Sequence, residues 1–255
     1  MTSSTSNSNY GKTGAIDFNN RRAMRSIYET EHRLLATLRS KHFFFGADKP
    51  TTFTLIFERK SGLPAYPTFD TFTSWSGDYK KKAFGYDYNL NDDSSSLLYI
   101  PTRNDPLVCY SRDCGNEGSA DALAREEAVL NLLYNVFGLE GKAGEIADRG
   151  SMRFPWQSSL DFKITQILPG FRENDEFVIT LGIENLLNLL DDDKGVIRYG
   201  YYSGRIPVID LKIVDGERYD YSRNAFRYSF SNPYNMSLSA TQSVWRAQLG
   251  FKYNF

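Results

Sequence analysis

The last eleven residues of the chain, Trp245 to Phe255, alternate strictly between apolar and polar side chains. Every odd position is apolar or aromatic, whereas no even position holds a large hydrophobic residue. Because successive side chains of a strand point to opposite faces, this pattern predicts a β-strand with one apolar and one polar face. Its length matches the about 9–11 residues that a tilted strand needs to cross a bilayer. A half-buried strand at the end of a soluble sheet alternates in the same way, so this segment alone leaves both interpretations open.

Four further segments show the same period of two, and they begin near Arg33, Thr51, Ser158 and Glu176. Their apolar positions are Leu34, Ala36 and Leu38, then Phe53, Leu55 and Phe57, then Leu160, Phe162 and Ile164, then Phe177, Ile179, Leu181 and Ile183. Turn-forming residues at 46–50 and 169–175 join these segments in pairs, which predicts two antiparallel hairpins. The chain is therefore predicted to be all-β, with five long strands.

The connections between these strands alternate in length. Those at 46–50 and 169–175 are short, whereas those at about 76–155 and 190–240 are very long. Bacterial outer-membrane barrels have this asymmetry, with short turns on the periplasmic side and long loops outside. A soluble β-sandwich has no reason to sort its loops by length. The pattern predicts a segment of an antiparallel transmembrane β-barrel with long extracellular loops.

The first long connection also contains the one convincing helix of the sequence, between Ser119 and Leu139. Ser119 suits the N-cap position and Gly138 suits the end of the helix. One broad face, expected to pack on the protein itself, gathers Leu123, Leu130, Leu133, Tyr134 and Phe137. Residues 1–25, in contrast, are rich in Ser, Thr and Asn and are predicted to form a polar tail or loop.

Composition excludes several classes of protein. Lys and Arg number 30 against 31 Asp and Glu, so nothing indicates a nucleic-acid-binding surface. Aromatic residues make up 15% of the chain, which favours β structure. A mean hydropathy of −0.47 excludes a helical membrane protein but not a barrel, because half of each barrel strand is polar. No signal peptide is visible, so an exported protein would need an N-terminal region beyond this chain.

Two groups of residues are candidates for binding chemistry. Cys109 and Cys114 lie in a polar stretch without a nearby His, which argues against a zinc site. In an exported protein they would close a small disulfide, whereas in a cytosolic protein they would be two thiols, and the sequence leaves this open. Asp87, Asn89 and Asn91 alternate as in the first half of an EF-hand loop, but the required Gly and closing Glu are absent. A solvated turn is favoured there, and no metal or cofactor is expected.

Catalytic signatures are missing from the sequence. It contains no GxSxG, HExxH or Gly-rich phosphate loop, and His32 and His42 belong to no triad or metal constellation. We therefore do not expect an enzyme. The alternative to a barrel is a soluble all-β module that binds glycans through the aromatic and acidic side chains of residues 199–234.

Several segments together resemble a known family. They are SIYETEHRLLATL, FERKSGLPAYPTF, SSLLYIP, RGSMRFPWQSSLDFKITQILPGF, ITLGIENLLNLLDD and VWRAQLGFKYNF. Their order and spacing from Ser26 to the C-terminus resemble the last part of the barrel in TonB-dependent receptors of the Oar-like subgroup. The resemblance implies a receptor or transporter of the bacterial outer membrane, with a barrel of about 22 strands closed by a plug.

The resemblance also implies the partners of the chain. They are outer-membrane lipid, the barrel assembly machinery and, only through N-terminal regions that this sequence lacks, the TonB complex. Without a plug or a TonB-interacting segment, residues 26–255 are expected to be a barrel fragment that does not transport by itself. The substrate is not indicated.

A C-terminal aromatic strand of this kind resembles the signal that the assembly machinery reads in the family. The residues that carry this signal by resemblance are Trp245, Leu249, Phe251, Tyr253 and Phe255. Phe255 is expected to be the most important of them.

Overall fold

A computed structural model of the chain describes residues 23, 25–26, 28–74, 82–87, 96–200, 204–214, 218–224, 233–234 and 236–255. Most of the predicted polar tail at 1–25 therefore lies outside the described residues. The described residues are predominantly β-strand and divide into two compact units. The core unit takes its residues from 1–29, 63–154 and 200–236, and the sheet unit takes its residues from 30–62, 155–199 and 237–255.

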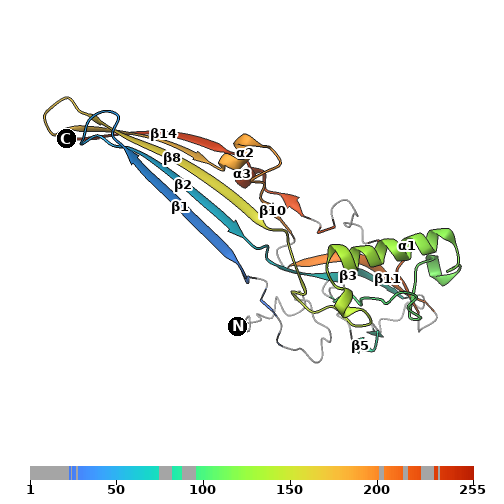
Figure 1. The fold of residues 1–255 in the computed structure, drawn as a ribbon. Coiled ribbons are helices and arrows are strands. Elements are labelled where there is room, and N and C mark those ends of the chain that lie inside the picture. Colours follow the sequence, from blue (N-terminus) through green and yellow to red (C-terminus); the bar gives the residue numbers. More distant parts are fainter. Residues whose placement is uncertain are drawn as a thin grey trace. The chain divides into compact units, whose positions relative to one another are not determined.

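The sheet unit is built on five antiparallel strands in the order β1-β2-β8-β9-β14 (Figure 1). Their bounds are Arg33–His42 for β1, Thr51–Lys60 for β2, Gln157–Pro169 for β8, Glu176–Glu184 for β9 and Arg246–Asn254 for β14. The five strands predicted from the period of two are confirmed, and each begins within one residue of its expected start.

Both short turns of the sheet unit lie at the same end of the sheet, together with the C-terminus (Figure 1). The strand register gives the same result, because His42 pairs with Thr51 at this end while Glu176 pairs with both Pro169 and Asn254. Gly46 adopts a φ of +118° in the first turn, a conformation that favours glycine. The two predicted hairpins are confirmed.

The core unit contains a second five-stranded sheet, in the order β6-β12-β11-β3-β7. Its strands are Val108–Cys109 (β6), Arg218–Asp220 (β12), Arg205–Val214 (β11), Pro64–Ser74 (β3) and Met152–Arg153 (β7). β3 runs parallel to β11, and β6 runs parallel to β12. The antiparallel arrangement expected for the five long strands holds in the sheet unit, and these parallel pairs within the long connections were not predicted. Parallel neighbours need a long connection between them, and the segments that separate these strands in the sequence supply it.

The predicted helix is present as α1, Ala120–Asn131, continued by a π-helical turn η3, Leu132–Val136. The Ser119 hydroxyl accepts a hydrogen bond from the Ala122 amide at 3.2 Å and so caps the helix. The predicted apolar face is only partly confirmed, because Leu123 is 55% exposed. The buried face instead follows the helical repeat through Ala122, Glu126, Val129 and Leu133, and Leu123 lies at the edge of it.

Short elements complete both units. In the core unit they are β4 (Lys82–Ala83), β5 (Tyr86–Asp87), η2 (Arg112–Cys114) and η4 (Glu140–Lys142). In the sheet unit they are α2 (Leu186–Leu190), β10 (Arg198–Tyr199), β13 (Ser237–Leu238) and α3 (Ala240–Ser243). β10 pairs with β13 as a second, two-stranded sheet.

The main hydrophobic core lies in the core unit. Its largest fully buried members include Tyr66, Phe69, Leu98, Ile100, Leu133, Ile206, Ile209 and Tyr221. Strand β11 is buried over most of its length, so it is the central strand of that core. Among the described residues, no helix combines the length and the apolar character needed to cross a membrane.

Candidate functional site

The five-stranded sheet of the sheet unit has one continuous apolar face, because the registers of all five strands bring their apolar positions into common rows. One row is Leu38, Leu55, Phe162, Ile183 and Ala247. The next is Ser40, Phe53, Ile164, Leu181 and Leu249. Since neighbouring side chains in a row share a face, the period of two in each strand becomes one apolar surface across the sheet.

This apolar face is not covered by the described part of the chain. In the five strands only Thr51 and Thr52 are buried. On the edge strands, Leu38 is 66% exposed, Leu249 is 59% exposed and Phe251 is 71% exposed, whereas the apolar side chains that the inner strands β2, β8 and β9 place on this face are half-buried. Soluble monomers rarely expose contiguous apolar surface on this scale, and such a surface marks contact with a membrane or another protein.

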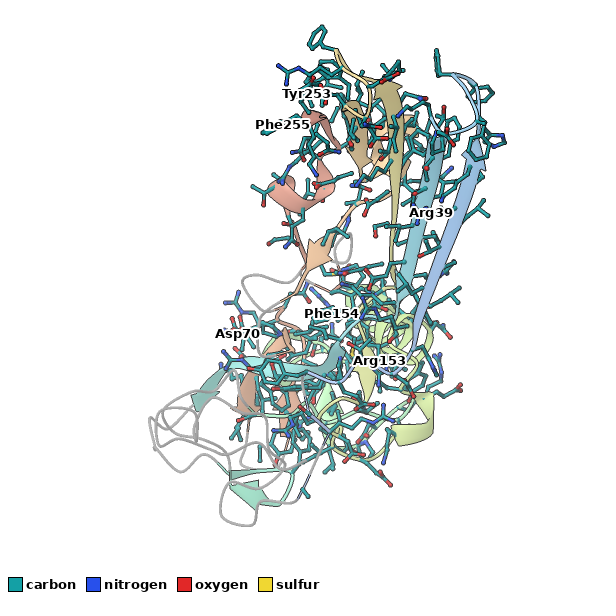
Figure 2. All side chains as sticks on the ribbon, turned by 90° about the vertical axis from the view of Figure 1, so that its left-hand side faces the viewer. Arg39, Asp70, Arg153, Phe154, Tyr253 and Phe255 are labelled. Atoms are coloured by element: carbon teal, nitrogen blue, oxygen red, sulfur yellow. A yellow bond between two sulfur atoms is a disulfide. The ribbon has the colours of Figure 1, made fainter. Side chains whose placement is uncertain are left out.

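Aromatic side chains lie at both ends of the sheet. At the turn end the ring of Phe177 lies 4.7 Å from that of Tyr253 and 5.3 Å from that of Phe171. Figure 2 labels Tyr253 and Phe255 at this end. At the opposite end His32 stacks on Trp156 at 6.1 Å, and the Arg59 guanidinium lies 5.4 Å from the Trp156 ring centroid.

The opposite face of the sheet is polar and hollowed. A hollow of about 420 Å³ is lined by polar residues that include Asp161, Lys163, Glu184 and Gln248, by Gly182 and Gly250, and also by Ile56, Phe162 and Ile183. The two glycines contribute to the space, since a Cβ at Gly182 would meet no atom within 4 Å. Arg33 and Glu58 form an ion pair at 2.7 Å on the same face. This face can hold water or polar groups, whereas the apolar face cannot.

Asn185 organises the end of β9 in the sheet unit, and the sequence analysis missed this role. It adopts a φ of +53°, which Asn tolerates better than most residues. Its Nδ2 donates to the carbonyl oxygens of Gly195 at 2.9 Å and Ser243 at 2.6 Å, and its amide donates to Asp161 at 2.8 Å. In the sequence, the signal for it is an Asn placed directly after an alternating strand.

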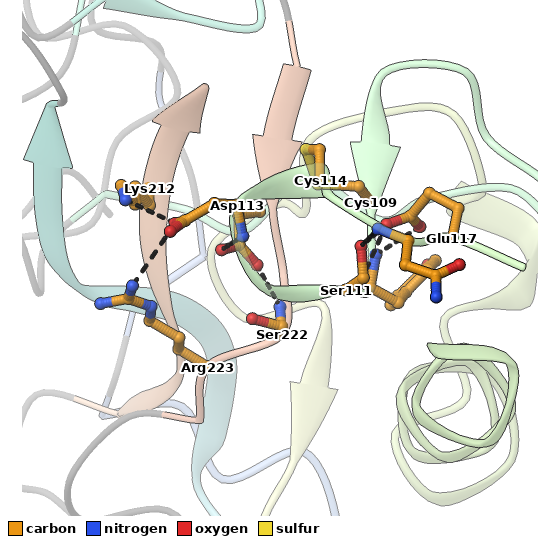
Figure 3. Close-up of a disulfide and its surroundings, with 11 residues drawn as sticks. Cys109, Ser111, Asp113, Cys114, Glu117, Lys212, Ser222 and Arg223 are labelled. Carbon is orange, nitrogen blue, oxygen red and sulfur yellow. Dashed lines mark hydrogen bonds and ion pairs between the residues drawn. A yellow bond between two sulfur atoms is a disulfide. The ribbon is translucent and has the colours of Figure 1, made fainter. Parts of the chain in front are cut away.

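In the core unit, Cys109 and Cys114 form a disulfide with a Cα–Cα distance of 5.4 Å (Figure 3). The pairing that was expected for an exported protein is therefore present. Asp113, inside this loop, forms ion pairs with Lys212 and, at 3.5 Å, with Arg223. The hydrogen bond from Lys212 holds the pKa of Asp113 below its usual value. These contacts attach the disulfide loop to strand β11 and to the segment after β12.

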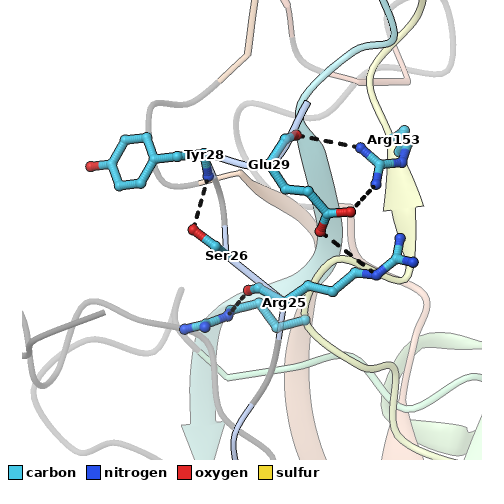
Figure 4. A network of polar contacts seen from close by, with 6 residues as sticks. Arg25, Ser26, Tyr28, Glu29 and Arg153 are labelled. Carbon is cyan, nitrogen blue, oxygen red and sulfur yellow. Dashed lines mark hydrogen bonds and ion pairs between the residues drawn. The ribbon is translucent and has the colours of Figure 1, made fainter. Parts of the chain in front are cut away.

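A second polar network attaches residues 25–29 to β7 within the core unit (Figure 4). Arg153 forms an ion pair with Glu29 at 3.0 Å, and Arg25 lies 3.8 Å from the same carboxylate. Arg149 donates from Nε to the Arg25 carbonyl at 3.0 Å. The network is half-buried and has the character of a structural anchor.

The remaining candidate residues that the structure describes make structural contacts. Tyr219 and Tyr221, from the stretch considered for glycan binding, are buried in the core, and Tyr219 stacks on Phe84 at 3.8 Å. Of the EF-hand-like residues, Asn89 and Asn91 lie outside the described residues. His42 packs against aromatic rings of the sheet unit. No cluster of three or more potential metal ligands occurs in the part of the chain that the structure describes.

Comparisons with known proteins add no family to these observations. No protein-family model, no curated protein and no solved structure matches the chain significantly.

Proposed function

We propose that the five-stranded sheet is part of a transmembrane β-barrel in a bacterial outer membrane, within a TonB-dependent receptor that resembles the Oar-like subgroup. In this proposal the apolar face contacts lipid and the hollowed polar face lines the lumen. The observation that carries it is the uncovered apolar face, which spans all five strands in register. Lipid is the occupant that accepts such a face without a specific partner surface.

The aromatic side chains at the two ends of the sheet support the same assignment. Outer-membrane barrels carry girdles of aromatic residues at both membrane–water interfaces. The turn-end rings, Phe171, Phe177 and Tyr253, would form one girdle, and Trp156 and Trp245 would belong to the other. Strand lengths of 9 to 13 residues agree with the thickness of a bilayer.

The number of strands supports a segment rather than a complete barrel. The sheet has two edge strands, β1 and β14, and the smallest closed barrels need about eight strands. Hydrocarbon offers no hydrogen-bond partner to an open edge, so further strands would have to pair with both edges. Transport by this segment alone is not part of the proposal.

The terminal strand would also carry the signal for barrel assembly, a role proposed from the family resemblance. Phe255 is 98% exposed and lies 6.4 Å from Tyr253. Phe251 and Leu249 are exposed on the same face, and Trp245 lies at the other end of the segment. Deletion of Phe255 is expected to reduce the amount of folded, heat-modifiable barrel on gels, whereas Asn254→Ser, on the polar face, should leave it unchanged.

The proposal is tested in membranes of bacteria that express this chain from its native reading frame. A sodium carbonate wash strips soluble and peripheral proteins from membranes and leaves barrels in place. We expect the protein to remain in the outer-membrane pellet. Release into the supernatant would favour a soluble all-β module and would contradict the proposal.

A further inference from the structure

The core unit contains a hollow of about 500 Å³ beside the disulfide loop. Three arginines line it: Arg112 from the disulfide loop, Arg125 from α1 and Arg223 from the segment after β12. The sequence separates them widely, so the fold brings three cationic side chains to one cavity.

The cationic charge of the hollow is only partly neutralised by the protein. The Arg112 guanidinium has no hydrogen-bond or ion-pair partner within the described part of the chain, whereas the Arg112 carbonyl accepts a hydrogen bond from the Gly115 amide at 3.2 Å. Among the described residues, the Arg125 guanidinium donates to one group, the neutral amide oxygen of Asn224, at 2.7 Å. Arg223 shares Asp113 with Lys212, at 3.5 Å from the carboxylate. Among the described residues that line the hollow, one acidic residue, Asp121, accompanies the three arginines.

Hydroxyl-bearing residues also line the hollow, among them Tyr110, Ser111 and Ser119. Tyr110 lines the hollow, is only 6% exposed, and its hydroxyl has no hydrogen-bond partner in the described part of the chain. Burial and the nearby carboxylates of Glu126 and Asp105 raise the pKa of this hydroxyl, so it stays protonated and is not assigned to the ligand. The hydroxyl of Ser119 already caps α1 and Ser111 already bonds to Glu117, so these groups serve the fold.

We propose that this hollow binds a small oxyanion, a carboxylate or phosphate group of a solute or of a larger ligand. Guanidinium forks match both groups in geometry and charge. The disulfide positions Arg112, because Tyr110, Ser111 and Arg112 lie between Cys109 and Cys114. The site does not depend on the proposed function of the sheet, since every lining residue belongs to the core unit.

The test measures binding of inorganic phosphate and of citrate to the full chain in detergent micelles by titration calorimetry. We expect saturable binding of at least one anion, weakened about tenfold or more in Arg112→Gln and in Arg125→Gln, since each removes a charge-assisted donor. Arg103→Gln is the matched control, because Arg103 is an exposed arginine of the same unit that pairs with Glu127 outside the hollow. It should bind as the unchanged chain does.

Asp121→Asn separates a loss of binding from a loss of folding. Removing the Asp121 carboxylate from the lining should strengthen binding severalfold, a gain that a folding defect cannot produce. Preference for phosphate or for citrate identifies the group that the hollow favours. The proposal is overturned if neither anion binds saturably, if Arg103→Gln weakens binding as much as Arg112→Gln, or if Asp121→Asn gives no gain.

Discussion

The core unit buries its large apolar side chains, whereas the sheet unit leaves its own exposed on one face. In the core unit Phe69, Leu133 and Ile209 are fully buried. In the sheet unit Leu38 and Leu249 are more than half exposed, although their strands have lengths similar to those of β3 and β11. Both units are β-rich, so strand content does not separate them. The difference is that the core unit buries its apolar side chains against one another, whereas the apolar face of the sheet unit has to be covered by something else.

This contrast predicts different responses to mutation. The largest effect is expected in the core unit, where Leu133→Ala would leave a cavity and lower the free energy of unfolding by about 2–5 kcal/mol. Leu123→Ala, on the same helical segment but exposed, should cost well under about 1 kcal/mol. Both changes in the free energy of unfolding can be measured by denaturant titration with near-UV circular dichroism as the signal. Equal losses would mean that the helix does not pack as described.

In the sheet unit, the effect of a charge should depend on the face rather than on burial. Leu181→Arg introduces a charge on the apolar face and is expected to cost about 2–4 kcal/mol in a bilayer. Thr180→Arg, one residue earlier on the hollowed polar face, should be much milder. Each variant is expressed from the native reading frame, and the amount of folded protein in outer membranes measures the effect of each substitution. A similar loss at the two positions would refute the assignment of the faces.

The disulfide gives the smallest of these effects. Replacing both Cys109 and Cys114 by Ser should lower the stability of the core unit by about 2 kcal/mol, because the loop that the disulfide closes is short. The sheet unit contains no cysteine and should be unaffected. Thiol labelling before and after reduction confirms the bond in the unchanged protein. Free thiols without reductant would contradict the pairing.

The sequence predicted the sheet unit far better than the core unit, for a physical reason. Each strand of the sheet unit has one apolar and one polar face, so its period of two is visible in the sequence. Strand β11 is buried along most of its length, and its run of Ile206, Val208 and Ile209 shows no such alternation. The β-branched residues of β11 could have indicated a strand. Its parallel pairing with β3 gave no sequence signal, because β3 is distant in the sequence.

The same reasoning explains which sites were found. The disulfide was foreseen as one of two outcomes because its cysteines lie five residues apart. The arginine-lined hollow was not foreseen, because Arg112, Arg125 and Arg223 come from three elements and meet only in the folded chain. The assembly residues at the C-terminus stay a prediction.

The central claim, that the apolar face of the sheet contacts lipid, is tested most directly by spin labels on adjacent residues of β14. Labels are attached at Leu249→Cys and at Gln248→Cys, in protein from the native reading frame reconstituted into bilayers. Oxygen, which concentrates in hydrocarbon, and a water-soluble nickel chelate then report the surroundings of each label. We predict that the label at 249 is reached by oxygen and shielded from the chelate, and that the label at 248 shows the reverse. Equal access of the chelate to both labels would contradict the account.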